Sequence, residues 1–222
     1  STTTSFATGG TYFLYAILDQ LPTDPSCRPS AAYSLTVLDI PSANPVSNQT
    51  VCAGSSTAPV NFSGPVPGTT YSWTNNNPGI GLAAGGTGNI PSFTAINNGT
   101  APVTATITVT PSVNDPATNT TCTGSPITFM ITVNPVPTVN AVANQTYCNG
   151  SSVPSITFSS NVPGAVINWS RTAQSIGLAP TSGTGSVPAF TATNATNAPV
   201  TATFTATATY TNNGVPCTGP SV

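Results

Sequence analysis

Cysteine is the residue type in this chain whose spacing best supports a specific chemistry. The five cysteines are Cys27, Cys52, Cys122, Cys148 and Cys217. No two of them show the CxxC spacing of zinc sites, and the chain contains no histidine, so metal binding is poorly supported. Disulfide formation is the chemistry we expect, and it implies export to an oxidising compartment.

Groups that could perform acid–base or nucleophilic catalysis are scarce. The 222 residues include no histidine, lysine or glutamate, and the four aspartates are scattered without recurring between aligned parts of the chain. The glycine-rich segment Gly85–Gly88 lacks the lysine and following helix of a phosphate-binding loop, which favours a turn with positive φ. We therefore expect no enzymatic activity, no cofactor and no metal.

An internal repeat sets the positions of the cysteines. The stretch Ile80–Ala95 returns as Ile176–Ala192 with one inserted residue, and Ala101–Thr106 returns unchanged as Ala198–Thr203. We define repeat 1 as residues 1–43, repeat 2 as residues 44–138 and repeat 3 as residues 139–222. Repeat 1 is expected to be the C-terminal part of a preceding immunoglobulin-like unit, repeat 2 a complete unit, and repeat 3 a unit that lacks its last strand.

The repeat frame also suggests how the cysteines pair. Cys52 and Cys122 fall in repeat 2, Cys148 and Cys217 fall in repeat 3, and Cys27 matches the second member of each pair. We predict the disulfides Cys52–Cys122 and Cys148–Cys217, with the partner of Cys27 lying outside this sequence. Each bond would join the first strand region of a repeat to the loop before its last strand.

Composition and patterning point to all-β structure. Charged residues make up 3% of the chain, against about 25% in an ordinary soluble domain, and no basic cluster suggests nucleic-acid binding. Val103–Thr110 alternates apolar and threonine residues, as in a strand with one buried face. Further strands are expected at residues 10–18, 33–38, 46–51, 59–62, 70–75, 80–82, 90–95 and 127–133. No apolar run is long enough to cross a membrane.

The aromatic residues are expected to serve mainly the core. Trp73 lies within a predicted strand where sandwich domains often bury a tryptophan, and Trp169 repeats it. Phe93 and Phe190 occupy matching positions and are assigned to the core as well. Carbohydrate binding is a competing role for exposed aromatics, with Tyr71, Tyr147, Tyr210 and Phe6 as candidates. Short proline-containing linkers should string the repeats together semi-rigidly.

The order of short motifs in repeats 2 and 3 resembles that of a known family. Asn-Gln-Thr-x-Cys-x-Gly-Ser-Ser is followed by Val-Pro-Gly, Tyr-Ser-Trp-Thr-Asn-Asn, Ile-Gly-Leu-Ala and Cys-Thr-Gly. This pattern is similar to the PKD-like repeats of very large Bacteroidota surface proteins. The resemblance implies extracellular β-sandwich arrays, often exported by type IX secretion, in adhesins linked to attachment and gliding motility. It supplies no catalytic residue.

The function that these observations favour is a structural stalk or filament segment of a secreted or cell-surface adhesin. Its expected partners are neighbouring repeats of the same chain, copies of itself in a filament, and extracellular polysaccharide; nucleic acid is not expected, nor is a membrane span within this sequence. The main alternative is a carbohydrate-binding accessory module of a secreted protein. Ice binding by outward threonine rows and assembly by strand donation are further alternatives.

Overall fold

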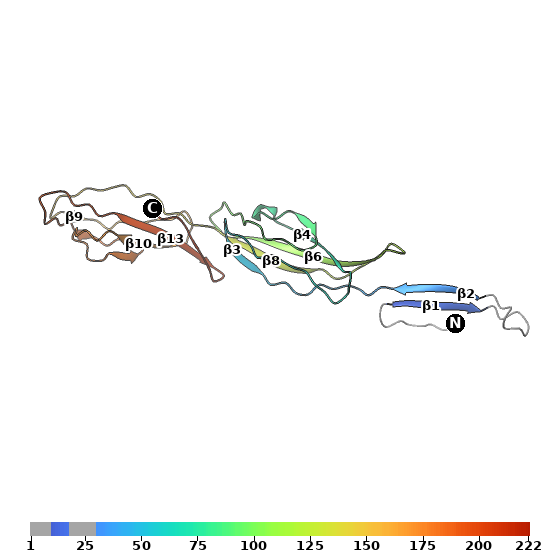
Figure 1. The fold of residues 1–222 in the computed structure, drawn as a ribbon. Helices are drawn as coiled ribbons and strands as arrows, with labels where there is room; N and C mark the ends of the chain where they lie inside the picture. Colours follow the sequence, from blue (N-terminus) through green and yellow to red (C-terminus); the bar gives the residue numbers. More distant parts are fainter. Residues whose placement is uncertain (1–9, 18–29) are drawn as a thin grey trace, which may run out of the picture.

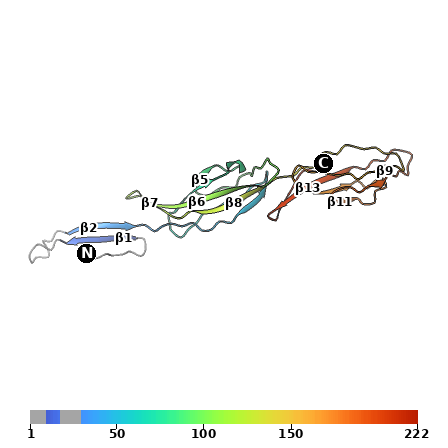
Figure 2. The same ribbon diagram turned by 180° about the vertical axis from the view of Figure 1, so that it is seen from behind.

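The computed structural model describes residues 10–17 and 30–222, and its strands follow one another along an elongated molecule (Figures 1 and 2). In the first two repeats the strands are β1 Gly10–Ile17, β2 Ser30–Val37, β3 Gln49–Cys52, β4 Thr70–Asn75, β5 Gly85–Thr87, β6 Val103–Asp115, β7 Thr120–Thr123 and β8 Ile127–Asn134. Repeat 3 contributes β9 Ser152–Val153, β10 Val166–Arg171, β11 Ser182–Thr184, β12 Phe190–Thr191, β13 Phe204–Asn212 and β14 Val215–Thr218. The expected all-β class is confirmed.

In repeat 1 the described strands β1 and β2 form an antiparallel hairpin. Repeat 2 is built on a sheet with the order β3-β8-β6-β4-β5, and β7 extends it by pairing with the far end of β6. Strands β3 and β8, the first and last of the repeat, lie side by side and run parallel. The chain therefore enters the repeat at one end, and both β3 and β8 finish at the opposite end.

The strand β6 shows how the threonine-rich alternation builds the core. Ala105, Ile107 and Val109 are fully buried, whereas the intervening threonines point to the other face of the sheet. A thin second layer covers the apolar face through the antiparallel bridges Ser56↔Thr94 and Val60↔Ile90. The result is a sandwich with one broad and one narrow layer.

Repeat 3 reproduces this arrangement with a sheet in the order β11-β10-β13-β14. Its narrow layer contains β9 paired with β12 and the bridge Ile156↔Val187. Val222 and Ala206 exchange two backbone hydrogen bonds. By the repeat, they match Ile127 and Val109, which pair in repeat 2 where β8 begins. Residues 145–148, which match β3, are exposed and form no strand in the described structure.

The glycine-rich stretch acts as a close-packed cover for the tryptophan. Gly86 in β5 lies opposite Trp73, and a Cβ added there would meet the indole ring at 2.5 Å. Gly183 holds the same place against Trp169. Gly88 has a φ of 72°, which confirms the expected turn with positive φ. The glycines are thus required by packing and by turn geometry.

Three short strands expected from the sequence differ in the structure. The segment expected as a strand at residues 80–82 instead begins with the last residue of the 3-10 helix η2 (Pro78–Ile80), which Gly81 ends in the left-handed conformation. The strands expected at 59–62 and 90–95 are reduced to the isolated bridges Val60↔Ile90 and Ser56↔Thr94. Conversely, Cys122 lies within strand β7, where a loop was expected.

The packing of glycine against tryptophan yields a stability prediction. Gly86→Ala should lower the free energy of unfolding of repeat 2 by about 1–3 kcal/mol, because the added methyl group must displace the Trp73 ring. Urea unfolding followed by the fluorescence of Trp73, in a Trp169→Phe background, measures this effect. Gly99→Ala is the matched control, since its Cβ meets only the Asn97 Oδ1 atom, at 3.3 Å. Equal losses for both variants would contradict the packing argument.

Candidate functional site: the junction between repeats 2 and 3

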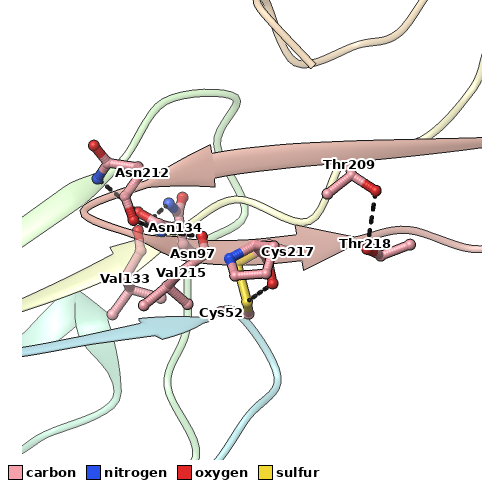
Figure 3. The surroundings of a disulfide bond; sticks show 10 residues. Cys52, Asn97, Val133, Asn134, Thr209, Asn212, Val215, Cys217 and Thr218 are labelled. Carbon is pink, nitrogen blue, oxygen red and sulfur yellow. Dashed lines mark hydrogen bonds between the residues drawn. A yellow bond between two sulfur atoms is a disulfide. The ribbon is translucent and has the colours of Figure 1, made fainter. Parts of the chain in front are cut away.

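A disulfide bond joins repeat 2 to repeat 3 (Figure 3). It links Cys52 to Cys217, whose Cα atoms are 5.5 Å apart and whose positions are separated by 165 residues. Cys122 and Cys148 are unpaired in the structure. The pairs Cys52–Cys122 and Cys148–Cys217 expected from the sequence are therefore corrected: the observed bond connects successive repeats instead of closing each one. Cys27 lies outside the described residues.

The sheet geometry explains why the bond within repeat 2 does not form. Cys52 ends β3 and pairs with Asn134 of β8. The residue before Asn134, Val133, pairs with Val103, so Cys52 lies at the level where β6 begins. Cys122 pairs with Val113. Val103 and Val113 are ten residues apart along one strand, or roughly 33 Å at the usual strand rise. A disulfide requires Cα atoms closer than about 7 Å, so the two cysteines lie at opposite ends of the repeat.

The partner surface on repeat 3 is the hairpin formed by β13 and β14. Its two-residue loop, Asn213-Gly214, has φ values of 50° and 74°, as a type I′ turn requires. This tight turn matches the twist of the two strands and holds Cys217 opposite Tyr210. The tip of the hairpin lies against the ends of β3 and β8, as Figure 3 shows.

Asparagine side chains connect the hairpin tip to repeat 2. Asn134 is completely buried, and its Nδ2 atom donates to the Asn212 carbonyl oxygen at 3.2 Å. Asn212 Nδ2 donates in return to Asn134 Oδ1 at 2.9 Å. Asn213 Nδ2 donates to the Thr50 hydroxyl at 3.3 Å. These neutral hydrogen bonds satisfy the buried amide and fix the hairpin in one position relative to the strand ends.

The linkers also lie against the repeats that they introduce. A Cβ added at Gly219 would collide with the Pro137 carbonyl oxygen, and a Cβ at Gly124 would collide with the carbonyl of Pro41. Both glycines belong to a Cys-Thr-Gly motif, so one short motif supplies a cysteine and the glycine against which the linker packs. The linker ends are also bound alike, because the Asn44 and Asn140 amides each donate to a serine hydroxyl at 2.9 Å.

The charged side chains that the structure describes around these sheets serve local structure. Arg171 donates to four carbonyl oxygens, those of Thr172, Gln174, Leu178 and Pro180. At the matching position in repeat 2, Asn75 binds the carbonyl oxygens of Leu82 and Ala83. Asp115 accepts hydrogen bonds from the Thr118 hydroxyl and the Ala117 amide, which hold the pKa of its carboxyl below the usual value. Within the described residues, no group of three or more potential metal ligands lies together.

The aromatic residues considered from the sequence are dispersed. Trp73 and Trp169 are buried in separate apolar clusters, and Phe93 and Phe190 pack, partly buried, against those clusters. Both indole N–H groups are buried without a hydrogen-bond partner.

The sugar-binding candidates are no more closely grouped. Tyr71 is buried against Phe62, with ring centroids 5.6 Å apart, so its ring offers no exposed face for stacking. Tyr147 is exposed and donates to Gln145, while Tyr210 is half-buried in β13. Phe6 lies outside the described residues. The structure thus brings no set of sugar-stacking aromatics together among the residues that it describes.

Comparisons with known proteins add little to the assignment. No protein-family model matches the chain, and no curated protein matches it. Among solved structures, the extracellular cadherin domains 1–4 of protocadherin gamma B7 match with a TM-score of 0.34 and 12% sequence identity. That match covers 97% of this chain and 56% of the other, so the chain spans about half the length of that structure. No helix in the described residues is long and apolar enough to span a membrane.

The junction geometry predicts the effect of removing its disulfide. Cys217→Ser should lower the stability of the coupled repeats by about 5 kcal/mol in the loop-entropy model, because a 165-residue loop is no longer closed. Calorimetry should then show repeats 2 and 3 melting as separate transitions. Cys148→Ser, which removes an exposed and unpaired cysteine, is the control and should leave the melting profile unchanged. A normal profile for Cys217→Ser would show that the bond does not couple the repeats.

Proposed function

We propose that this chain is a structural segment of a stalk or filament that is exported to the cell surface or beyond it. Residues 44–138 and 139–222 act as successive β-sandwich units joined by a disulfide bond, and residues 1–43 contribute the paired strands β1 and β2 before them. The observation that carries the proposal is the Cys52–Cys217 bond, because a disulfide between units resists both bending and separation at the junction. Such bonds persist in oxidising compartments outside the cytosol.

The remaining features of the junction support the same function. The linker is held against the following repeat, and the buried Asn134 orients the hairpin tip. Contacts of this kind make each unit a rigid spacer that holds a distal binding region away from its attachment point. The nearly charge-free composition, with two basic residues in the whole chain, leaves few sites for trypsin-like proteases.

The motif pattern of repeats 2 and 3 supports a more specific assignment. In this assignment the segment belongs to a giant adhesin of the Bacteroidota cell surface, is exported by type IX secretion and serves attachment or gliding. Its partners are neighbouring repeats, together with extracellular polysaccharide bound elsewhere on the protein. We propose no catalytic activity and no cofactor for this segment.

A mechanical measurement tests the stalk function. Single-molecule force spectroscopy, with the chain held at its two ends, should show that the residues between Cys52 and Cys217 do not extend while the bond is intact. Reduction should release these 165 residues and lengthen the unfolded chain by roughly 500–600 Å, because an extended residue spans about 3.3–3.6 Å. Cys217→Ser should behave as the reduced chain does without added reductant. The proposal fails if the maximum extension is the same with and without reductant.

A further inference from the structure

Among the described residues, Cys122 and Cys148 are unpaired, and they occupy the same sequence positions in their repeats as Cys217 and Cys52. Cys122 lies opposite Val113 in the β6–β7 hairpin, just as Cys217 lies opposite Tyr210 in the β13–β14 hairpin. Each is followed by Thr-Gly. Repeat 2 therefore carries Cys122 at the same register of its hairpin as repeat 3 carries Cys217.

Cys148 matches Cys52 in the turn that follows it. The carbonyl oxygen of Cys52 accepts from the Ser55 amide, and that of Cys148 accepts from the Ser151 amide. The glycine between them donates to Ala95 in repeat 2 and to Ala192 in repeat 3. Cys148 is exposed, so it is accessible to an incoming thiol.

A second observation shows that the entry to repeat 2 has the geometry of a junction. Pro41 is buried, and its carbonyl oxygen lies against Gly124 as that of Pro137 lies against Gly219. The linker into repeat 2 thus follows the same course as the linker into repeat 3, where the clasp is observed. This course of the linker would place the strand ends of a preceding repeat next to Cys122.

From these equivalences we propose that Cys122 and Cys148 each form a further disulfide bond to another repeat. Cys122 bonds a cysteine at the Cys52 position of a preceding repeat, and Cys148 bonds the Cys-Thr-Gly hairpin of a following one. The partner is another repeat of this kind, in the same chain or in a second copy. The contact is head-to-tail and heterologous, so it continues along a line instead of closing on itself.

The chemistry is thiol–disulfide exchange with an external disulfide oxidant, either a small-molecule disulfide or an oxidoreductase. The Cys148 thiolate attacks one sulfur of the oxidant, forms a mixed disulfide and releases the first oxidant thiolate. The Cys122 thiolate of the partner then attacks the Cys148 sulfur and releases the second. Two protein thiols are oxidised, one oxidant disulfide is reduced, and the two protons pass to the released thiolates.

Successive clasps of this kind overlap along the chain. Cys148 lies between Cys52 and Cys217, so a bond from Cys148 to the next repeat would begin inside the loop that the observed bond closes. Tension on one repeat would then be shared with its neighbours through more than one covalent path. The inference rests on the proposed stalk function only for the nature of the partner.

Selective cross-linking between two variants of the chain tests the pairing. Both carry Cys27→Ser; one adds Cys148→Ser and keeps Cys122, and the other adds Cys122→Ser and keeps Cys148. They are oxidised together in a glutathione redox buffer, and disulfide-linked dimers are separated by mass. Unselective oxidation gives about twice as much mixed dimer as either like dimer. We expect the mixed dimer to exceed each like dimer by roughly tenfold or more, which is about fivefold above the unselective ratio and corresponds to about 1 kcal/mol of preference. A distribution near the unselective ratio would overturn the pairing.

Disulfide mapping of the exported protein provides a second measurement. Digestion without reduction, followed by mass spectrometry, should link the Cys122 peptide to a cysteine of a preceding repeat and the Cys148 peptide to one of a following repeat. A Cys122–Cys148 bond within one chain, a Cys122–Cys27 bond, or free thiols at both positions would overturn the proposal. The force measurement on Cys52–Cys217 is independent of this result, so failure here leaves the stalk function separately testable.

Discussion

The parallel pairing of β3 with β8 is the constraint from which the junction follows. Because the first strand of repeat 2 runs beside the last one in the same direction, Cys52 is carried to the end of the repeat where the linker departs. The β13–β14 hairpin of repeat 3 lies beside that linker. Cys217 is two residues before Gly219, which packs against the carbonyl group of Pro137. The bond therefore forms between repeats because the strand directions bring these two cysteines together.

The scarcity of charge shapes how the repeats hold together. With 3% charged residues, ion pairs cannot determine the contact, and neutral amides take that role at the hairpin tip. A buried asparagine such as Asn134 is costly unless each of its polar atoms is satisfied. Its two-way pairing with Asn212 meets that requirement in only one arrangement of the repeats, which gives the junction a defined geometry. Neutral contacts of this kind also depend little on salt.

Glycine and proline serve the array in two distinct ways. Within a repeat, Gly86 and Gly183 allow the short strands β5 and β11 to lie directly on a tryptophan ring. Between repeats, Gly124 and Gly219 allow a linker carbonyl to approach the backbone. In both places a side chain would separate two surfaces that must touch. The same composition that could suggest a disordered chain therefore reflects close packing.

The sequence by itself determined the all-β class, the repeat and the inward face of β6, because period-two alternation and recurring motifs are local properties that survive without knowledge of the fold. It also placed Trp73 and Trp169 within strands. Only the tertiary structure decided the cysteine pairing. Repeats 2 and 3 each carry one early and one late cysteine, so the same spacing fits a bond within a repeat or a bond to the next. The choice depends on which end of the sandwich each strand reaches, and strand direction is a long-range property that the spacing of Cys52, Cys122, Cys148 and Cys217 does not contain.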